Sequence, residues 1–181
     1  SKQLLALAAD EVQRREMFVL LDEQRDAFNH VMHAVDSARR GVTKTAVIVS
    51  GGPGSGKSVI ALSIMGELAR QGRAVIHATG SRSFTQTLRK VAAARAPRVR
   101  KAFQYFNSFM ETEPNSLDCL ILDEAHRIRE TSVNRWTSAA LRTGRPQIDE
   151  LLEAALVPVF LLDQDQVVRP GELGTVDDIE A

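Results

Sequence analysis

The stretch from residue 51 to residue 58 constrains the fold more than any other part of the chain. It satisfies the G-x-x-x-x-G-K-[ST] pattern at every required position and reads Gly51-Gly52-Pro53-Gly54-Ser55-Gly56-Lys57-Ser58. Glycine adopts backbone angles that are closed to other residues, so successive N–H groups can converge on one anion. The stretch is therefore predicted to be a phosphate-binding loop.

The side chains of this loop have separate roles. Lys57 supplies a positive charge for the β- and γ-phosphates of a nucleotide, and the Ser58 hydroxyl can ligate Mg²⁺. A helix that starts here directs the positive end of its dipole at the same anion. We therefore expect ATP and Mg²⁺ as ligands. The predicted nucleotide-binding residues are Gly52, Pro53, Gly54, Ser55, Gly56, Lys57 and Ser58.

The flanking sequence has the strand and the helix that such a loop requires. Residues 45–49 form a short β-branched run that is typical of a buried parallel strand. Apolar residues from Val59 to Leu68 then recur at helical spacing, and Gly72 is placed to end that helix. This strand–loop–helix context favours nucleotide binding over a chance glycine-rich turn.

A second motif lies about 65 residues after the loop, the usual separation in such NTPases. Residues 120–122 are apolar and lead into the adjacent carboxylates Asp123 and Glu124. At the carboxyl end of a parallel strand these side chains face the crevice where ligands bind. Asp123 is predicted to hold Mg²⁺, and Glu124 to polarise the attacking water. A base beside the metal-holding carboxylate favours transfer to water over a kinase reaction.

The remaining elements indicate one α/β domain with a P-loop NTPase, RecA-like fold, in which helices flank a mostly parallel sheet. Further strands are expected at 74–78, 117–122 and 157–162, and 103–110 is ambiguous, with a strand at its start as one reading. Helices are expected at 2–16, from an Asp22 N-cap to about Arg40, at 83–94 and at 147–155. Residues 127–146 are expected to form a long loop with one helical turn at most.

Composition sets few further limits. Of 181 residues, 44% are hydrophobic, and 23 basic residues balance 23 acidic ones, so net charge neither favours nor excludes a nucleic-acid partner. Cys119, the single cysteine, is expected to be a buried hydrophobe. No run approaches the length of a membrane span and no signal-peptide pattern opens the chain, so a cytoplasmic location is expected.

The end of the last strand carries a third motif. Asp163-Gln164-Asp165-Gln166 resembles the Asp-x-x-Gln motif of superfamily 1 helicases and translocases. The string from Asp123 to His126 by itself resembles the DEAH branch of superfamily 2, but the third motif of that branch is absent. Within superfamily 1 the motif sequences and their spacing are most similar to those of the Schlafen-group helicase-like ATPase domains, over roughly residues 18–175. The segments that carry this resemblance are 51–58, 123–128 and 160–171.

This resemblance implies further roles. Gln166 would sense the γ-phosphate, and Gln24, within 20–25, would contact the adenine edge. Residues 78–82 would hold phosphates of single-stranded DNA or RNA. A second motor lobe would supply an arginine finger, and Arg169 is the nearest local candidate. Residues 1–181 are thus expected to be a single lobe with an N-terminal helical extension at 1–17, to hydrolyse ATP slowly alone and to bind nucleic acid weakly.

Other interpretations stay open. The chain could be an NTP-driven switch acting on a protein partner, a nucleotide-binding module that is catalytically idle, or, less well supported by Glu124 and Gln166, a P-loop kinase. Residues 95–106 could combine a basic groove with stacking aromatics or a solvated helix end with core aromatics. Four histidines lack a ligand cluster around them and are not expected to bind metal: His30, His33, His77 and His126.

Overall fold

In the computed structural model, residues 20–41, 43–81, 101–142, 144–163 and 172–173 are described. The helices predicted at 2–16 and 83–94 lie outside these residues. So do Gln166 and Arg169.

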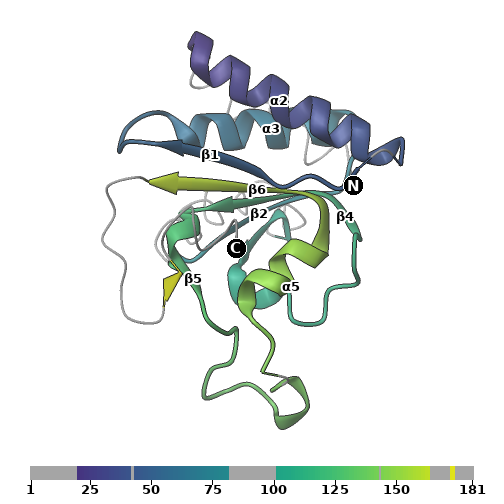
Figure 1. Ribbon diagram of the computed structural model, residues 1–181, viewed down its shortest axis with the longest axis vertical. Helices are drawn as coiled ribbons and strands as arrows, with labels where there is room; N and C mark the ends of the chain where they lie inside the picture. The colour runs from purple at the N-terminus through teal and green to yellow at the C-terminus, as the bar shows by residue number, and fades with distance from the viewer. Residues whose placement is uncertain (1–19, 42, 82–100, 143, 164–171, 174–181) are drawn as a thin grey trace.

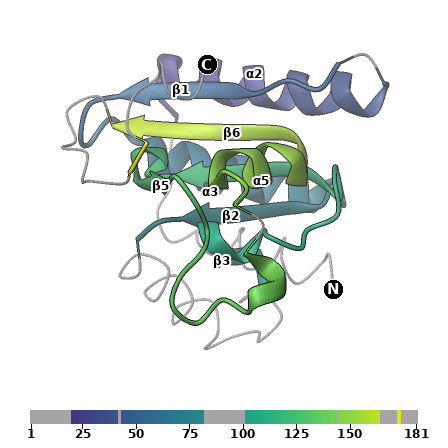
Figure 2. The ribbon, with the colours of Figure 1, turned by 60° about the horizontal axis from the view of Figure 1, so that its bottom comes forward.

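A parallel sheet of five strands forms the centre of the described structure, in the order β1-β6-β4-β2-β3 (Figure 2). Its strands are β1 (Val47–Gly51), β2 (Val75–Thr79), β3 (Phe103–Tyr105), β4 (Leu117–Asp123) and β6 (Ala155–Asp163). The predicted α/β fold with a parallel sheet is confirmed. The ambiguous segment at 103–110 begins with β3 and continues into a 3₁₀ helix, η2 (Phe106–Ser108).

Helices cover the two faces of the sheet (Figure 1). On one side lie α2 (Asp22–Arg39) and α3 (Lys57–Arg70), and on the other lies α5 (Gln147–Ala154). Gly41 and Gly72 follow α2 and α3 with φ angles of 75° and 72°. These are left-handed conformations that glycine adopts without a Cβ penalty, so the predicted helix ends are confirmed.

The start of α2 differs from the prediction. Leu21, not Asp22, is the N-cap residue, and Asp22 lies in the first turn. The Gln24 side-chain oxygen accepts a hydrogen bond from the Leu21 N–H at 3.1 Å, and the Leu21 carbonyl accepts the bond from the Arg25 N–H at 2.9 Å. The side-chain hydrogen bond at the start of this helix is therefore made by Gln24, which accepts from the Leu21 N–H, and not by an Asp22 cap. Asp22 places its charge near the positive end of the helix dipole instead.

Alternate side chains of the central strands enter two separate apolar cores. Cys119, Ile121 and Val159 face α2 and α3, whereas Leu120 and Phe160 pack on the α5 side. All five are fully buried. Burial on both faces is typical of parallel strands between helical layers, and it explains the continuous apolar runs in the sequence. Burial also raises the pKa of the Cys119 thiol, as expected for an inert, apolar cysteine.

The segment between β4 and α5 is more structured than predicted. It contains the 3₁₀ helices η3 (Ala125–Arg127) and η4 (Ala139–Leu141) and the short strand β5 (Ile128–Arg129). β5 pairs in antiparallel fashion with β7 (Glu172–Leu173), which comes from beyond the last strand of the main sheet. This small second sheet was missed because neither strand is long enough to show a period.

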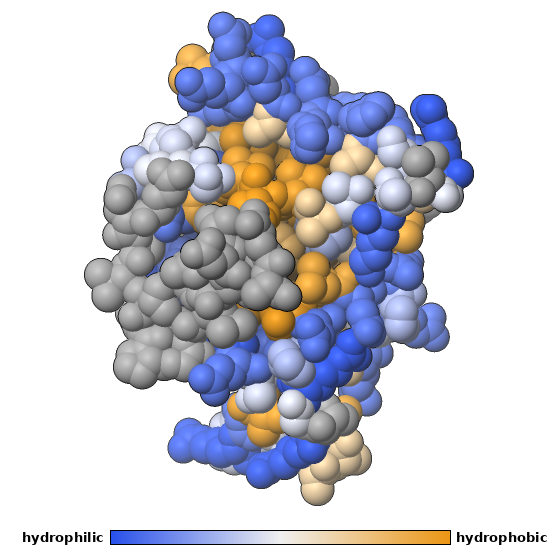
Figure 3. Space-filling view, in the orientation of Figure 1, coloured by the Kyte–Doolittle hydropathy of each residue, from blue (hydrophilic) through white to orange (hydrophobic). Residues whose placement is uncertain are grey.

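The hydropathy of the surface differs from one layer to the next. In the orientation of Figure 1, hydrophilic residues cover α2, and apolar residues gather in the middle of the view, at the level of β1 and β6 (Figure 3). In the described part of the chain, no helix combines the length and the hydropathy that a membrane span would need.

Candidate functional site

The phosphate loop connects β1 to α3, as the sequence predicts. Gly54 and Gly56 have φ angles of 78° and 84°, and Gly56 is the N-cap of α3. A side chain at Gly56 would be strained by this backbone and would also collide with Gln24, whose amide nitrogen lies 2.1 Å from an ideal Cβ. The two glycines let the chain fold around a small space at the helix N-terminus.

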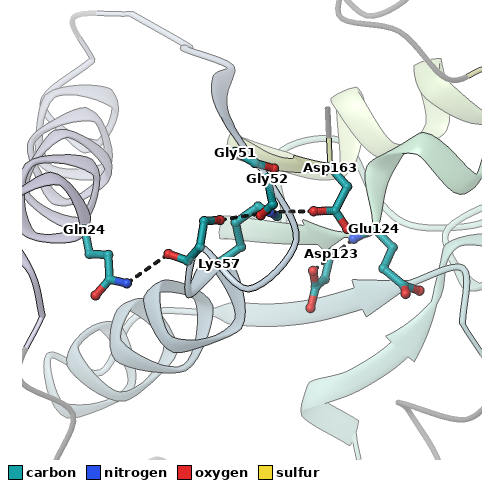
Figure 4. Close-up of polar contacts among 8 residues, drawn as sticks. Gln24, Gly51, Gly52, Lys57, Asp123, Glu124 and Asp163 are labelled. Atoms are coloured by element: carbon teal, nitrogen blue, oxygen red, sulfur yellow. Dashed lines mark hydrogen bonds and ion pairs between the residues drawn. The ribbon is translucent and has the colours of Figure 1, made fainter. Parts of the chain in front are cut away.

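The Lys57 ammonium group lies inside its own loop (Figure 4). Its Nζ donates to the carbonyl oxygens of Gly51 at 2.7 Å and Gly52 at 2.8 Å, and to the Ser55 hydroxyl at 3.0 Å. It also forms an ion pair with Asp163 at 2.6 Å, and the two side chains are only 12% and 18% exposed. The positive charge is therefore held at the centre of the loop by neutral oxygens and one carboxylate.

Asp163 is a site residue to which the sequence analysis gave no role. It ends β6, and its Cα is in register with Gly51 at the end of β1. Because these two strands are parallel neighbours, the last residue of one meets the beginning of the loop that follows the other. The sequence signal that could have found it is its place as the first residue of the Asp-x-x-Gln motif, at the end of an expected strand.

Asp123 ends β4 and is buried, with 6% of its surface exposed. Its Oδ1 accepts a hydrogen bond from the Glu124 N–H at 2.9 Å, and its Oδ2 lies 3.3 Å from Nε2 of His77 on the neighbouring strand β2. Both oxygens are thus held by short contacts, which fixes the orientation of the carboxylate. His77 serves here as a support for Asp123.

Glu124 follows Asp123 with φ 53° and ψ 47°, a left-handed conformation that is uncommon outside glycine. Its Oε2 lies 3.4 Å from the Thr79 hydroxyl and 3.2 Å from Nε of Arg127. This backbone conformation turns the chain sharply after β4. Adjacent carboxylates therefore have different neighbours, His77 for Asp123 and Arg127 for Glu124.

One cavity of about 270 Å³ joins the motifs. Residues 54–58 line it together with Asp123, Glu124 and Asp163. The cavity lies at the carboxyl ends of β1, β4 and β6, where ligands bind in open parallel sheets. Ser58, in the first turn of α3, contributes an exposed hydroxyl. The structure thus brings together the two predicted motifs that it describes.

Gln24 lies beside this cavity. Its side-chain nitrogen donates to the Ser55 carbonyl at 2.9 Å and thereby ties the start of α2 to the loop (Figure 4). Of the other loop residues, Gly52 accepts a bond from Lys57 and another from the Ser55 N–H at 3.2 Å, while Pro53 is exposed.

His30 and His33 are exposed on α2, and His77 and His126 are buried. Within the described ranges no group of three or more His, Cys, Asp or Glu side chains is arranged to hold a metal ion.

Comparison with known families gives one result. A family model described as "Schlafen group 3, DNA/RNA helicase domain" matches residues 44–181. No similar protein was found among the curated proteins. The matched part contains the phosphate loop, the carboxylates after β4 and the end of β6, and it covers well over half of the chain. The chain therefore belongs to the Schlafen group 3 DNA/RNA helicase domain family.

Proposed function

We propose that this chain binds and hydrolyses Mg-ATP and acts as the motor lobe of a superfamily 1 type helicase or translocase. The observation that supports this most is that one cavity is lined both by Lys57, at the start of α3, and by Asp123 and Glu124, at the end of β4. The helicase-domain family points in the same direction, because it implies a helicase-like protein and interaction with nucleic acid in general.

Lys57 would bind the β- and γ-phosphates. Its ammonium already lies at the centre of the loop, so phosphate oxygens would replace the Gly51 and Gly52 carbonyls and the Asp163 carboxylate as acceptors. An exchange of acceptors costs less than desolvating a free lysine, and hydrogen bonds between charged groups are the stronger kind. The contacts of Lys57 thus support an anion-binding site at the centre of the loop.

The donor set also fits Mg²⁺. This ion prefers hard oxygen ligands and keeps several waters. The Ser58 hydroxyl and the Asp123 carboxylate, which line the same cavity, offer such oxygens. When bound, Mg²⁺ neutralises charge on the phosphates. His77 would keep the Asp123 carboxylate turned toward the metal.

Glu124 would orient and deprotonate the attacking water. Its carboxylate lines the cavity and is 32% exposed, so water can reach it. A base of this kind contributes through proton transfer at the transition state. Gln24, which touches the loop through Ser55, would bind the adenine edge, and Gln166, three residues beyond Asp163, would sense the γ-phosphate.

Calorimetric titration with a non-hydrolysable ATP analogue and Mg²⁺ tests the binding step. Lys57→Ala removes a charge-assisted contact, and we expect a loss of about 1.5–3 kcal/mol, or roughly 10- to 150-fold in affinity. Lys44→Ala is the matched control. Lys44 lies before β1 and bonds Asn115 at 2.8 Å, away from the loop, so this variant should bind like the wild type.

Equal affinity of the wild type and Lys57→Ala would contradict the proposed site. A steady-state ATPase assay with and without single-stranded DNA or RNA then separates the motor from its alternatives. Stimulation by the polymer supports a helicase or translocase. Turnover that ignores nucleic acid would instead favour a switch that acts on a protein partner.

A further inference from the structure

A second cavity, of about 370 Å³, lies next to Glu124, because its lining residues Thr79 and Arg127 both contact the Glu124 carboxylate. It forms where the ends of β2 and β3 meet the segment after β4. Its lining includes Thr79, Gly80, Tyr105, Asn107, Arg127 and Arg129. None of the described lining residues is a carboxylate, whereas two are arginines and several are amides or hydroxyls. This composition suits a ligand with negatively charged oxygens.

Arg127 connects the two cavities through its ion pair with Glu124. Its side chain lines the second cavity, while its Nε lies 3.2 Å from Oε2 of Glu124, which lines the first. Both residues lie on one tight turn, closed by the hydrogen bond from the Arg127 N–H to the Glu124 carbonyl at 2.9 Å. The pair is partly exposed, at 26% for Arg127 and 32% for Glu124, so other partners can compete for either group.

The stem of Arg127 is confined. An ideal Cβ at Gly80 would lie 2.6 Å from the Arg127 Cβ and 3.3 Å from its Cδ. Gly80, just after β2, therefore leaves the space in which this stem packs. With its stem held there, the guanidinium can shift between Glu124 and the second cavity without a rearrangement of the backbone.

We propose that the second cavity binds a backbone phosphate of single-stranded nucleic acid, and that this phosphate draws Arg127 away from Glu124. The inference rests on the proposed function and adds a regulatory step to it. A phosphate offers the guanidinium two oxygens and a full charge, the geometry that arginine binds best. Glu124, released from the ion pair, is then free to orient the attacking water. Amides such as Asn107 position the backbone without reading sequence.

Because Glu124 and the phosphate compete for Arg127, the effect of each on the other must be reciprocal. If the phosphate weakens the Arg127–Glu124 pair, then removing the Glu124 charge must strengthen phosphate binding by the same coupling. This effect appears in binding alone and requires no turnover. It can therefore be measured on a slow enzyme.

The experiment measures binding of labelled single-stranded DNA and RNA oligonucleotides by fluorescence anisotropy at low salt, where phosphate contacts contribute most. The proteins are the wild type, Glu124→Gln, Arg127→Gln and the double variant. We expect Glu124→Gln to bind about two- to fivefold more tightly, the range for one partly exposed ion pair. Arg127→Gln should bind more weakly, and the double variant should match it. Whichever oligonucleotide binds identifies the polymer.

Arg70→Gln is the matched control, because Arg70 forms an ion pair of the same i,i+3 spacing with Glu67, on α3. It should not change oligonucleotide affinity appreciably. Titration with the ATP analogue shows that each variant is folded. It also separates the two proposals, since intact Mg-ATP binding keeps the proposed site whatever the oligonucleotides do.

Three outcomes would overturn the inference. The first is equal oligonucleotide affinity of the wild type and Glu124→Gln. The second is a gain in Glu124→Gln that persists when Arg127 is also replaced, which would show a general charge effect. The third is binding of an acidic peptide such as polyglutamate with no binding of either oligonucleotide, which would assign the cavity to a protein partner.

Discussion

The two cavities that flank Glu124 are built in different ways. The first cavity is lined by one continuous loop, by the ends of β4 and β6 and by Glu124, and Lys57 contacts its own loop and Asp163. The second cavity takes its walls from separate segments, among them Tyr105 after β3, Arg129 in β5 and Gln147 at the start of α5. Most of the first lining comes from one loop of consecutive residues, whereas the second comes from several segments that only the tertiary fold brings together.

A buried polar network supports the second cavity. The Ser132 hydroxyl donates to Glu150 at 2.5 Å and accepts from the Gln147 amide at 2.9 Å, and the Gln147 oxygen accepts the Arg129 N–H at 2.9 Å. Ser132, Gln147 and Glu150 are all less than 10% exposed. Side-chain hydrogen bonds thus hold the lining of the second cavity in place, whereas backbone carbonyls hold Lys57 in the phosphate loop. The comparison predicts that the two cavities can be damaged independently.

The largest effect is expected at Glu124, which lines the first cavity and pairs with Arg127 in the lining of the second. Glu124→Gln removes the base but keeps the shape of the side chain, so turnover should fall by roughly 10²- to 10⁴-fold while Mg-ATP stays bound. Single-turnover hydrolysis with protein in excess over labelled ATP measures this even when the wild type is slow. Hydrolysis at the wild-type rate would remove Glu124 from the mechanism and leave only its structural pairing with Arg127.

A smaller effect, on stability, is expected in the lining of the second cavity, which includes Ser132 and Gln147. Ser132→Ala leaves the buried Glu150 and Gln147 side chains without their shared partner, at a cost of about 1–3 kcal/mol in the free energy of unfolding. Urea denaturation measures it. Ser138→Ala is the control, because Ser138 is exposed and its side chain caps no helix. A loss of ATP-analogue affinity in folded Ser132→Ala would show that the cavities are not independent.

The smallest effect is expected at the tip of the segment that leads to α5. Trp136 is 80% exposed, and the Arg135 guanidinium lies 4.8 Å from its ring centroid. An exposed cation–π pair contributes little, so Trp136→Ala should change the unfolding free energy by about 0.5 kcal/mol or less. A larger loss in the same urea experiment would mean that the indole packs against another surface in solution.

The sequence predicted those features whose signal is local. The strand–loop–helix unit, the buried strand before Asp123 and the ends of α2 and α3 at Gly41 and Gly72 follow from residues that are neighbours in the chain. Their apolar runs and glycines need no knowledge of the rest of the fold. The roles assigned to Ser58, Asp123 and Glu124 stay predictions, although the structure places these residues around one cavity.

Features that depend on register between distant strands were missed. The pairing of Lys57 with Asp163 requires β1 beside β6, and the contact of His77 with Asp123 requires β2 beside β4. In neither pair does the sequence around one residue indicate which distant residue it contacts. The aromatic residues after Lys101 show the same limit. Phe103 is buried in one core, Phe106 is buried in the other and also lines the second cavity, and Tyr105 lines that cavity too, so the sequence pattern alone could not separate these positions.

The strand order also bears on how the chain acquires its shape during synthesis. Val47 in β1 pairs with Val159 in β6, roughly 110 positions later, and β6 is the neighbour of β1 in the described sheet. Such distant pairing must wait for loop closure and is intrinsically slow. During synthesis the phosphate loop therefore emerges from the ribosome long before β6 and the Asp163 at its end. The nascent chain carries the phosphate-loop motif early, but the cavity at that loop is complete only when β6 inserts into the sheet.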